Sequence, residues 1–205
     1  MKILNLYAGV GGNRKNWSNE HQVTAVELNE SIAECYKDLY PDDEVIVGDA
    51  HEYLLKHYAE YDFIWTSPPC QTHSRARQWV AQTYYDNKGG PKVEPVYPDM
   101  KLWQEIIFLK HHCKSLWVVE NVTPYYKPLI EPSFKIGPNM FWSNKTIDVK
   151  IDPKRKHFNS TKELEENRGL DLSKYTFKGI TKRQVLRNMV EPEVGNYILE
   201  KINGY

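Results

Sequence analysis

The sequence predicts an α/β fold in which helices cover both faces of a doubly wound, mostly parallel sheet. Three observations support this prediction. At 205 residues, the chain is long enough for one domain with a sizeable core. Short apolar runs of the kind that form buried parallel strands recur as far as residue 119. Helical patterns separate these runs, and such alternation is typical of a doubly wound sheet.

The individual elements follow from local patterns. The expected strands are residues 3–7, 23–28, 45–47, 61–65 and 116–119. Asn29 suits the cap of a helix that begins after the second strand and stops at Pro41. Further helices are expected at residues 53–58, after Asp49, and at residues 100–114.

The remaining segments are less regular. Residues 71–99 are polar and rich in glycine and proline, so we expect a long loop that acts as a lid. A hairpin is expected at residues 134–147 and a polar region at residues 161–173. Residues 181–202 predict two short helices separated near Pro192, because proline suits the first turn of a helix.

Composition argues against several classes of protein. Cys35, Cys70 and Cys113 form no CxxC pair and no even framework, so we expect a reducing, cytoplasmic setting without disulfides. The seven histidines show no metal-binding spacing, and we predict no metal. No apolar run is long enough for a membrane span, and the N-terminus is interpreted as a strand and not as a signal peptide.

Charge is unevenly distributed, although the formal net charge is zero. Residues 1–62 carry 5 Lys and Arg against 12 Asp and Glu, whereas residues 63–205 carry 22 against 15. The positive second part favours contact with phosphates, although ordinary variation in surface charge can produce a similar split.

A glycine cluster and two carboxylates indicate a cofactor site. Residues 8–12 read Ala-Gly-Val-Gly-Gly after the first strand, and we expect a helix to begin just beyond them, beside a bound ligand. Glu27 ends the second strand, where an acidic side chain commonly accepts the ribose hydroxyls of an adenosine, and Asp49 ends the third. The glycines are not directly followed by a lysine that would bind phosphates. This favours an adenosine without phosphates as the ligand.

Cys70 is the candidate nucleophile. It follows Ser67, Pro68 and Pro69 at the end of the fourth strand. Because prolines fix φ and cannot extend a central strand, the thiol is expected to face the cleft. Free cysteines are usually inert core residues, an interpretation that we keep for Cys35 and Cys113.

Together these motifs resemble the cytosine-C5 DNA methyltransferase family over nearly the whole chain. Residues 5–12 resemble its cofactor loop, Pro69-Cys70-Gln71 its nucleophile motif, Glu120-Asn121-Val122 its acid motif and residues 187–192 its final motif. The resemblance implies a Rossmann-like methyltransferase fold in a single catalytic domain, residues 1–205, that converts S-adenosylmethionine to S-adenosylhomocysteine. The implied cofactor-binding residues are Tyr7, Ala8, Gly9, Val10, Gly11, Gly12, Glu27, Leu28, Asp49, Ala50, Ser67, Pro69, Asn188, Met189 and Val190.

The chemistry of the family explains why these residue types occur together. Attack of Cys70 on C6 of cytosine makes C5 nucleophilic enough to accept a methyl group, while Glu120 protonates or hydrogen-bonds N3. Because C6 is hidden in a duplex, the base must be flipped out of DNA, which a monomer is expected to bind. The implied substrate-binding residues are Pro69, Gln71, Ser74, Arg75, Arg77, Asn121 and Val122, and Lys88 is a further candidate for contact with phosphates.

The sequence departs from the family at two places. Arginines are usual just before an aromatic strand, but residues 137–144 read Gly-Pro-Asn-Met-Phe-Trp-Ser-Asn. Either Arg75, Arg77 or a more distant cation replaces them, or turnover is slow or absent. Arginine also stands at position 187, where glycine is usual.

The second departure is the short interval at residues 145–180, which leaves only a remnant of a target-recognition domain. We therefore expect short or relaxed sequence selectivity, as would suit a compact modification enzyme of a phage or of a restriction-modification system. The basic residues in this interval either contact phosphates or form a solvated turn: Lys150, Lys154, Arg155, Lys156 and His157.

Other functions remain open. An RNA cytosine-C5 methyltransferase would apply the same chemistry to a flipped base. A non-catalytic descendant would bind nucleic acid or cofactor without turnover, although the intact Cys70 and Glu120 argue against it. An N-methyltransferase is less expected, because such enzymes place an aromatic residue where Cys70 stands. A redox enzyme is disfavoured by the absence of a GxGxxG pattern and of a resolving cysteine.

Overall fold

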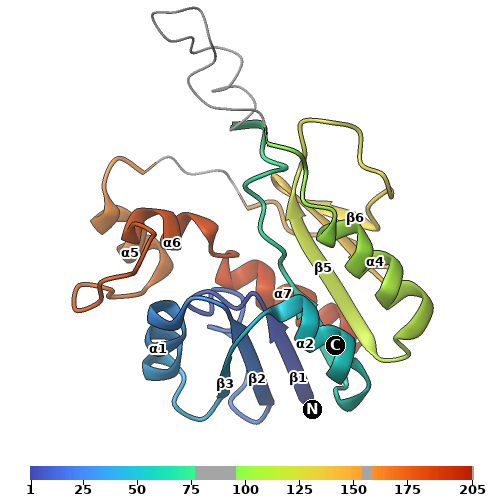
Figure 1. The fold of residues 1–205 in the computed structure, drawn as a ribbon, viewed down its shortest axis with the longest axis horizontal. Helices are drawn as coiled ribbons and strands as arrows, with labels where there is room; N and C mark the ends of the chain where they lie inside the picture. The colour runs from blue at the N-terminus through green and yellow to red at the C-terminus, as the bar shows by residue number, and fades with distance from the viewer. Residues whose placement is uncertain (77–95, 154–157, 205) are drawn as a thin grey trace, which may run out of the picture.

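The computed structural model describes residues 1–76, 96–153 and 158–204 and contains a seven-stranded sheet (Figure 1). Its strands lie in the order β3-β2-β1-β4-β5-β7-β6. The first five in this order are parallel, and β7 and β6 are antiparallel at one edge. The bounds are β1 Lys2–Leu6, β2 Gln22–Glu27, β3 Glu44–Val47, β4 Phe63–Thr66, β5 Leu116–Val122, β6 Phe134–Ile136 and β7 Asn139–Ser143. The predicted α/β fold with a mostly parallel sheet is confirmed.

The chain changes its direction of travel across the sheet at β1. Strands β1, β2 and β3 follow one another toward one edge, after which β4 returns to the other side of β1 and β5 lies beside it. Such a reversal leaves a crevice at the carboxyl ends of the central strands, where ligands bind in open α/β sheets. The loops after β1 and β4, which carry the glycines and Cys70, are therefore neighbours.

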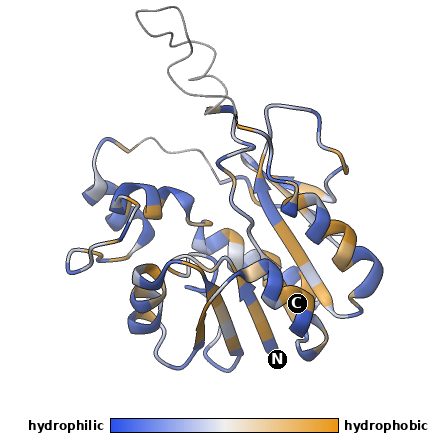
Figure 2. Ribbon diagram, viewed as in Figure 1, coloured by the Kyte–Doolittle hydropathy of each residue, from blue (hydrophilic) through white to orange (hydrophobic). Residues whose placement is uncertain are grey.

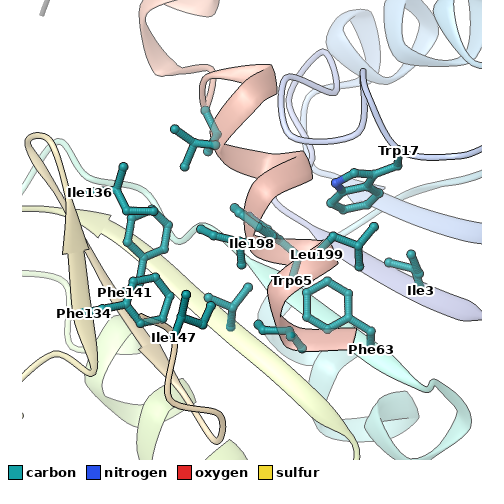
Figure 3. Packing of buried hydrophobic residues seen from close by; sticks show 14 of the residues in the cluster. Ile3, Trp17, Phe63, Trp65, Phe134, Ile136, Phe141, Ile147, Ile198 and Leu199 are labelled. Carbon is teal, nitrogen blue, oxygen red and sulfur yellow. The ribbon is translucent and has the colours of Figure 1, made fainter. Parts of the chain in front are cut away.

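Alternate side chains of each strand pack on opposite faces of the sheet. Ile3 and Phe63 belong to a buried cluster with residues of α7, whereas the next residues, Leu4 and Ile64, belong to a cluster with residues of α2 and α4. Figure 3 shows Ile198 of α7 among the side chains of the first cluster. In Figure 2 the hydrophobic colour is concentrated in the strands, as expected for a sheet that is covered on both faces.

Most helices begin where the sequence predicts them. Asn29 caps the first, accepting a hydrogen bond from the Ile32 amide at 3.3 Å. The second begins before residue 53, because Asp49 caps it by accepting from the Glu52 amide at 3.1 Å. The described helices are α1 Glu30–Leu39, α2 Ala50–His57, the 3-10 helix η1 Tyr58–Glu60, α4 Lys101–His112, α5 Thr161–Arg168, α6 Lys182–Asn188 and α7 Pro192–Asn203.

One prediction about the cofactor loop was wrong, because no helix begins within residues 7–18. These residues form successive turns, in which the amide of Gly11 donates to the carbonyl of Ala8 and that of Lys15 to the carbonyl of Gly11. Buried polar side chains within the loop fix its position. Asn13 donates to Asn5 of β1 at 2.8 Å, and Arg14 forms an ion pair with Asp43 at 2.9 Å.

The interval at residues 145–180 contains α5, which the sequence analysis did not predict. Ser160 caps this helix by accepting from the Glu163 amide at 3.1 Å. Leu164 of α5 is buried with Val185 of α6 and Ile32 of α1, so the interval packs against the sheet's flanking helices.

Several predictions concern residues 77–95 and 154–157, which lie outside the described part of the chain. Most of the expected lid falls there. The individual residues concerned are Arg77, Lys88, Lys154, Arg155, Lys156 and His157. Within the described residues, none of the helices has the length and apolar character needed to cross a membrane.

Candidate active site

A cavity of about 710 Å³ lies at the carboxyl ends of the parallel strands. The loops after β1, β2, β3 and β4 line it, together with β5 and the turn between α6 and α7. The cavity brings together most of the predicted site residues: Tyr7, Ala8, Gly9, Val10, Gly12, Glu27, Leu28, Asp49, Ala50, Ser67, Pro69, Cys70, Gln71, Glu120, Val122, Asn188, Met189 and Val190.

The other described candidates do not line the cavity. The carbonyl of Gly11 accepts a hydrogen bond from the Tyr40 hydroxyl at 2.9 Å. Arg75 donates from Nε to the carbonyl of Pro124 at 3.1 Å, and Ser74 pairs with the same residue in an isolated β-bridge. These contacts hold the loops that surround the cavity.

Asn121, another predicted substrate-binding residue, likewise does not line the cavity. Its side chain is 1% exposed, and its Nδ2 donates to the carbonyl of Pro68 at 2.8 Å. The acid motif on β5 is therefore tied directly to the loop that presents Cys70. In this structure the side chain of Asn121 fixes the position of one candidate catalytic residue relative to the other.

The glycine loop turns sharply after β1. Tyr7, Gly9 and Gly11 have φ values of 55°, 54° and 75°, in the left-handed region that glycine adopts easily and tyrosine rarely. This backbone directs the amide of Gly9 to Oε2 of Glu27 at 2.9 Å. Oε1 of Glu27 accepts from the Asn29 amide, also at 2.9 Å. One carboxylate therefore connects the glycine loop to the start of α1.

Gly12 permits the loop to approach the final motif closely. A Cβ atom at this position would lie 2.5 Å from the carbonyl oxygen of Val190 and 3.0 Å from Cβ of Met189. Because a backbone oxygen cannot move aside as a flexible side chain can, the approach requires glycine. The first and last motifs of the sequence are thus packed directly together beside the cavity.

Cys70 is presented as the two preceding prolines predict. It lines the cavity at the start of a turn in which its carbonyl accepts from the amides of His73 and Ser74, both at 3.0 Å. Burial raises the pKa of the thiol to about 11, and the negative charge of Glu120 raises it in the same direction. The thiol of the free protein is therefore neutral near pH 7, and an approaching substrate has to promote its deprotonation.

Glu120 lies within β5, and the prediction that this strand ends at residue 119 was wrong. The strand continues to Val122 because it pairs with β7, and Glu120 lies opposite Phe141. Strand β4 ends at Thr66, opposite Val119, so Glu120 is the first residue of β5 beyond that end. Its carboxyl lines the cavity although the residue is only 8% exposed.

The environment of Glu120 suits proton transfer. Burial raises the pKa of its carboxyl to about 7, against the opposing effect of a hydrogen bond with Ser67. A group with a pKa near the working pH can both give and accept a proton, which is the requirement for a general acid or base. The cavity is thus lined by a thiol and by a carboxyl with a pKa near neutrality, beside a glycine loop.

A comparison with protein families decides what this arrangement belongs to. Residues 1–123 match the family described as C-5 cytosine-specific DNA methylase. The matched region includes the glycine loop, Glu27, Cys70 and Glu120. The chain belongs to this family. The resemblance inferred from the motifs is thereby confirmed, whereas a search of curated proteins finds no match.

Two solved structures of methyltransferases can be aligned with part of this chain. A mutant of Spodoptera frugiperda DNMT2 is 25% identical over an alignment that covers 59% of this chain and 35% of that protein, with a TM-score of 0.38. The SAM-dependent methyltransferase from Agrobacterium tumefaciens is 15% identical, with coverage of 62% and 40% and a TM-score of 0.38. The chain therefore spans 35% of the length of the DNMT2 structure that it matches.

Some residues that line the cavity of this methylase-family chain were not identified from the sequence. Asp99 and Lys101 are at the start of α4, and Lys101 forms an ion pair with Asp49 at 3.0 Å. Asn139 begins β7 and lies opposite Val122. These residues follow no recognisable motif, and only the folding of distant segments brings them to the cavity.

The structure also bears on the arginines that residues 137–139 lack. Within the described lining of the cavity, the positively charged side chains are those of Lys101 and Arg187. Arg75 is exposed and its Nε is engaged by Pro124, so it does not line the cavity here. Lys101 and Arg187 are therefore the candidates for the more distant cation that would replace the missing arginines.

Proposed function

We propose that this chain transfers a methyl group from S-adenosylmethionine to C5 of a flipped cytosine in DNA, through a covalent bond between Cys70 and C6. One observation carries the proposal: the thiol of Cys70 and the carboxyl of Glu120 line the same cavity as the glycine loop. Family membership rests on a sequence match over residues 1–123. Such a match does not by itself place these groups in one cavity. Cys70 lies in the loop after β4, Glu120 lies on β5, and the glycine loop follows β1.

The residues around the glycine loop fit an adenosine-containing cofactor. A Cβ atom at Gly9 would have no atom within 4 Å, so the loop leaves room for a ligand against its backbone. Glu27 supplies carboxylate oxygens beside this space, and Leu28 contributes an apolar side chain that is 70% exposed. An exposed leucine on a cavity wall suits the face of a flat purine ring. Bound S-adenosylmethionine would supply the methyl group.

The reaction assigns one task to each catalytic residue. As the Cys70 thiol loses its proton to water, its sulfur lone pair forms the bond to C6, and the electrons of the C5–C6 double bond move toward N3. Glu120 donates a proton to N3, which prevents negative charge from accumulating on the ring. C5 would then bond to the methyl carbon as that carbon's bond to the donor sulfur breaks, while N3 returns its proton to Glu120. Transfer of the proton on C5 to water re-forms the C5–C6 double bond and expels the Cys70 thiolate.

The electrostatics of the free cavity favour this order of events. Both Cys70 and Glu120 hold their protons more strongly than usual, because both are buried. An ionised Glu120 raises the pKa of Cys70, so protonated Glu120 is the form that best permits a thiolate to develop. The same protonated form is needed to donate to N3. Proton donation and nucleophilic attack are therefore compatible in a single ionisation state.

DNA is proposed as the substrate because the matched family is described as acting on it and because residues 63–205 carry a net positive charge. RNA is the second candidate, since a flipped cytosine presents the same atoms in either nucleic acid. A duplex cytosine would have to leave the stack to reach a thiol that lines a cavity. We propose that a monomer binds the nucleic acid.

The test is to incubate the protein with tritiated S-adenosylmethionine and separate pools of duplex DNA and RNA, and to detect 5-methylcytosine in each. Cys70→Ser is the inactivating variant, and Cys113→Ser is the matched control because Cys113 lies outside the cavity. Label in DNA that Cys70→Ser abolishes and Cys113→Ser retains supports the proposal. Label in RNA alone moves the function to the second candidate. Cofactor binding without label in either pool contradicts the proposed activity and favours a non-catalytic protein.

A further inference from the structure

Glu105 is a buried carboxylate that the proposed reaction does not use. It lies on α4, is 0% exposed and does not line the cavity. Three side chains from three other segments contact it. Oε1 lies 2.6 Å from the hydroxyl of Tyr7 and 3.1 Å from Nδ1 of His51, and Oε2 accepts from the hydroxyl of Thr66 at 2.7 Å. A carboxylate taken out of water persists only where such donors satisfy its oxygens.

The three partners lie at the carboxyl end of the sheet, where the cavity forms. Tyr7 is the first residue after β1 and begins the glycine loop. Thr66 is the last residue of β4, four residues before Cys70. His51 follows Ala50 at the start of α2, next to the loop that carries Asp49. Glu105 therefore connects the segment that would hold the methyl donor to the segment that presents the nucleophile.

The backbone conformation of Tyr7 depends on this connection. Its φ of 55° is in the left-handed region, which is unfavourable for any residue with a bulky side chain. Such a conformation persists when the surroundings hold it in place. The hydroxyl of Tyr7 provides that hold through Glu105, and the same turn sends the amide of Gly9 toward Glu27. A change at Glu105 is thus transmitted through Tyr7 to the backbone of the glycine loop.

We propose that Glu105 is a positioning residue that fixes the glycine loop and the Cys70 loop relative to each other, and so sets cofactor affinity and the alignment of donor and nucleophile. This inference rests on the proposed function for its catalytic meaning. Its structural content, the ordering of the glycine loop by a carboxylate on α4, can be measured in the protein without any substrate.

The experiment compares Glu105→Leu, which leaves the three donors without an acceptor, with Glu105→Gln, which keeps one carbonyl oxygen for Tyr7 and an amide group for the Thr66 hydroxyl. Leu109→Ala is the matched control, because Leu109 is 0% exposed on the same helix and contacts neither loop by a polar group. The measurements are the Kd of S-adenosylhomocysteine by calorimetry and hydrogen exchange of the Gly9 amide. Tyr7→Phe, which removes only the hydroxyl, serves if Glu105→Leu does not fold.

Glu105→Leu and Tyr7→Phe are expected to raise the Kd about tenfold and to speed exchange at Gly9, because each removes the hydrogen bond between Tyr7 and Glu105. Glu105→Gln is expected to restore the Kd to within about threefold of the unchanged protein, since it retains an acceptor. Leu109→Ala is expected to lower thermal stability with Kd and exchange unaltered. Equal exchange at Gly9 in all variants, or an equal rise in Kd for Leu109→Ala, would overturn the inference. A wild-type protein that methylates nothing would refute the proposed function and still leave the exchange result to decide the role of Glu105.

Discussion

Replacing Glu120 with glutamine should stabilise the fold at neutral and high pH while abolishing methyl transfer. Burial raises the pKa of Glu120 from 4.5 to about 7. Because the folded state binds this proton more tightly than the unfolded state, stability from this group is fully present below pH 4.5 and falls as pH rises to about 7. At 1.4 kcal/mol per unit of pKa, ionised Glu120 destabilises the folded protein by roughly 3 kcal/mol above pH 7.

The variant has no charge to bury, so its advantage over the unchanged protein should grow between pH 4.5 and 7 and then remain constant. Thermal unfolding followed by circular dichroism at pH 5 and pH 8.5 measures this difference. For a chain of this size, roughly 3 kcal/mol corresponds to a rise in Tm of about 6–12 °C at the higher pH. A variant that is equally or less stable than the unchanged protein at pH 8.5 would refute the assigned burial and pKa of Glu120.

Two further predictions concern Cys70 and Gly12. Because the pKa of Cys70 is about 11, alkylation of its thiol by iodoacetamide should quicken about tenfold per pH unit between pH 7 and pH 10. Glu120→Gln should quicken alkylation above pH 7, where Glu120 is ionised and its charge raises the pKa of the thiol. A rate that is flat over this range would contradict a neutral thiol. Gly12→Ala should weaken binding of S-adenosylhomocysteine at least about tenfold, because its Cβ would meet the Val190 carbonyl at 2.5 Å. Gly48→Ala is the control, since its Cβ would meet only Ile46 at 4.0 Å, and equal affinities of the two variants would refute the steric argument.

The fold was predictable because its signals are local. Each central strand is an apolar run that is buried on both faces, and two helices have clear start signals, the cap Asn29 and the first-turn proline Pro192. Helix α5 was missed because it is polar around most of its surface and buries only Leu164 and Arg168. The Ser160 and Glu163 pair could have indicated its start, since a serine followed three residues later by glutamate is a common capping pattern.

The candidate site was predictable where a motif follows a strand. Gly9, Gly12, Glu27, Asp49 and Cys70 line the same cavity because parallel strands bring their carboxyl ends to one edge. The conformation of the glycine loop was not predictable. The turns at residues 7–18 depend on Asn13, which binds Asn5 on β1, and on Arg14, which pairs with Asp43 beyond α1, and no local pattern in the sequence indicates these contacts.

Glu105 could not be found from the sequence for a related reason. It lies in a helix whose other buried residues are apolar, and its partners come from segments 39 to 98 residues away. A glutamate in such a helix would ordinarily be assigned to the solvent side. Only the packing of α4 against the ends of β1 and β4 makes it a buried acceptor.

The central claim is that Cys70 forms a covalent bond with C6 of cytosine, and trapping that bond is its most direct test. In an oligonucleotide with 5-fluorocytosine at the target position, fluorine replaces the proton that must leave C5, so the adduct cannot be resolved after methyl transfer. Mass spectrometry of the digested complex should find the modified nucleotide on the peptide that contains Cys70, and only when S-adenosylmethionine is present. An adduct on Cys113, or methyl transfer to ordinary cytosine by Cys70→Ser, would contradict the claim.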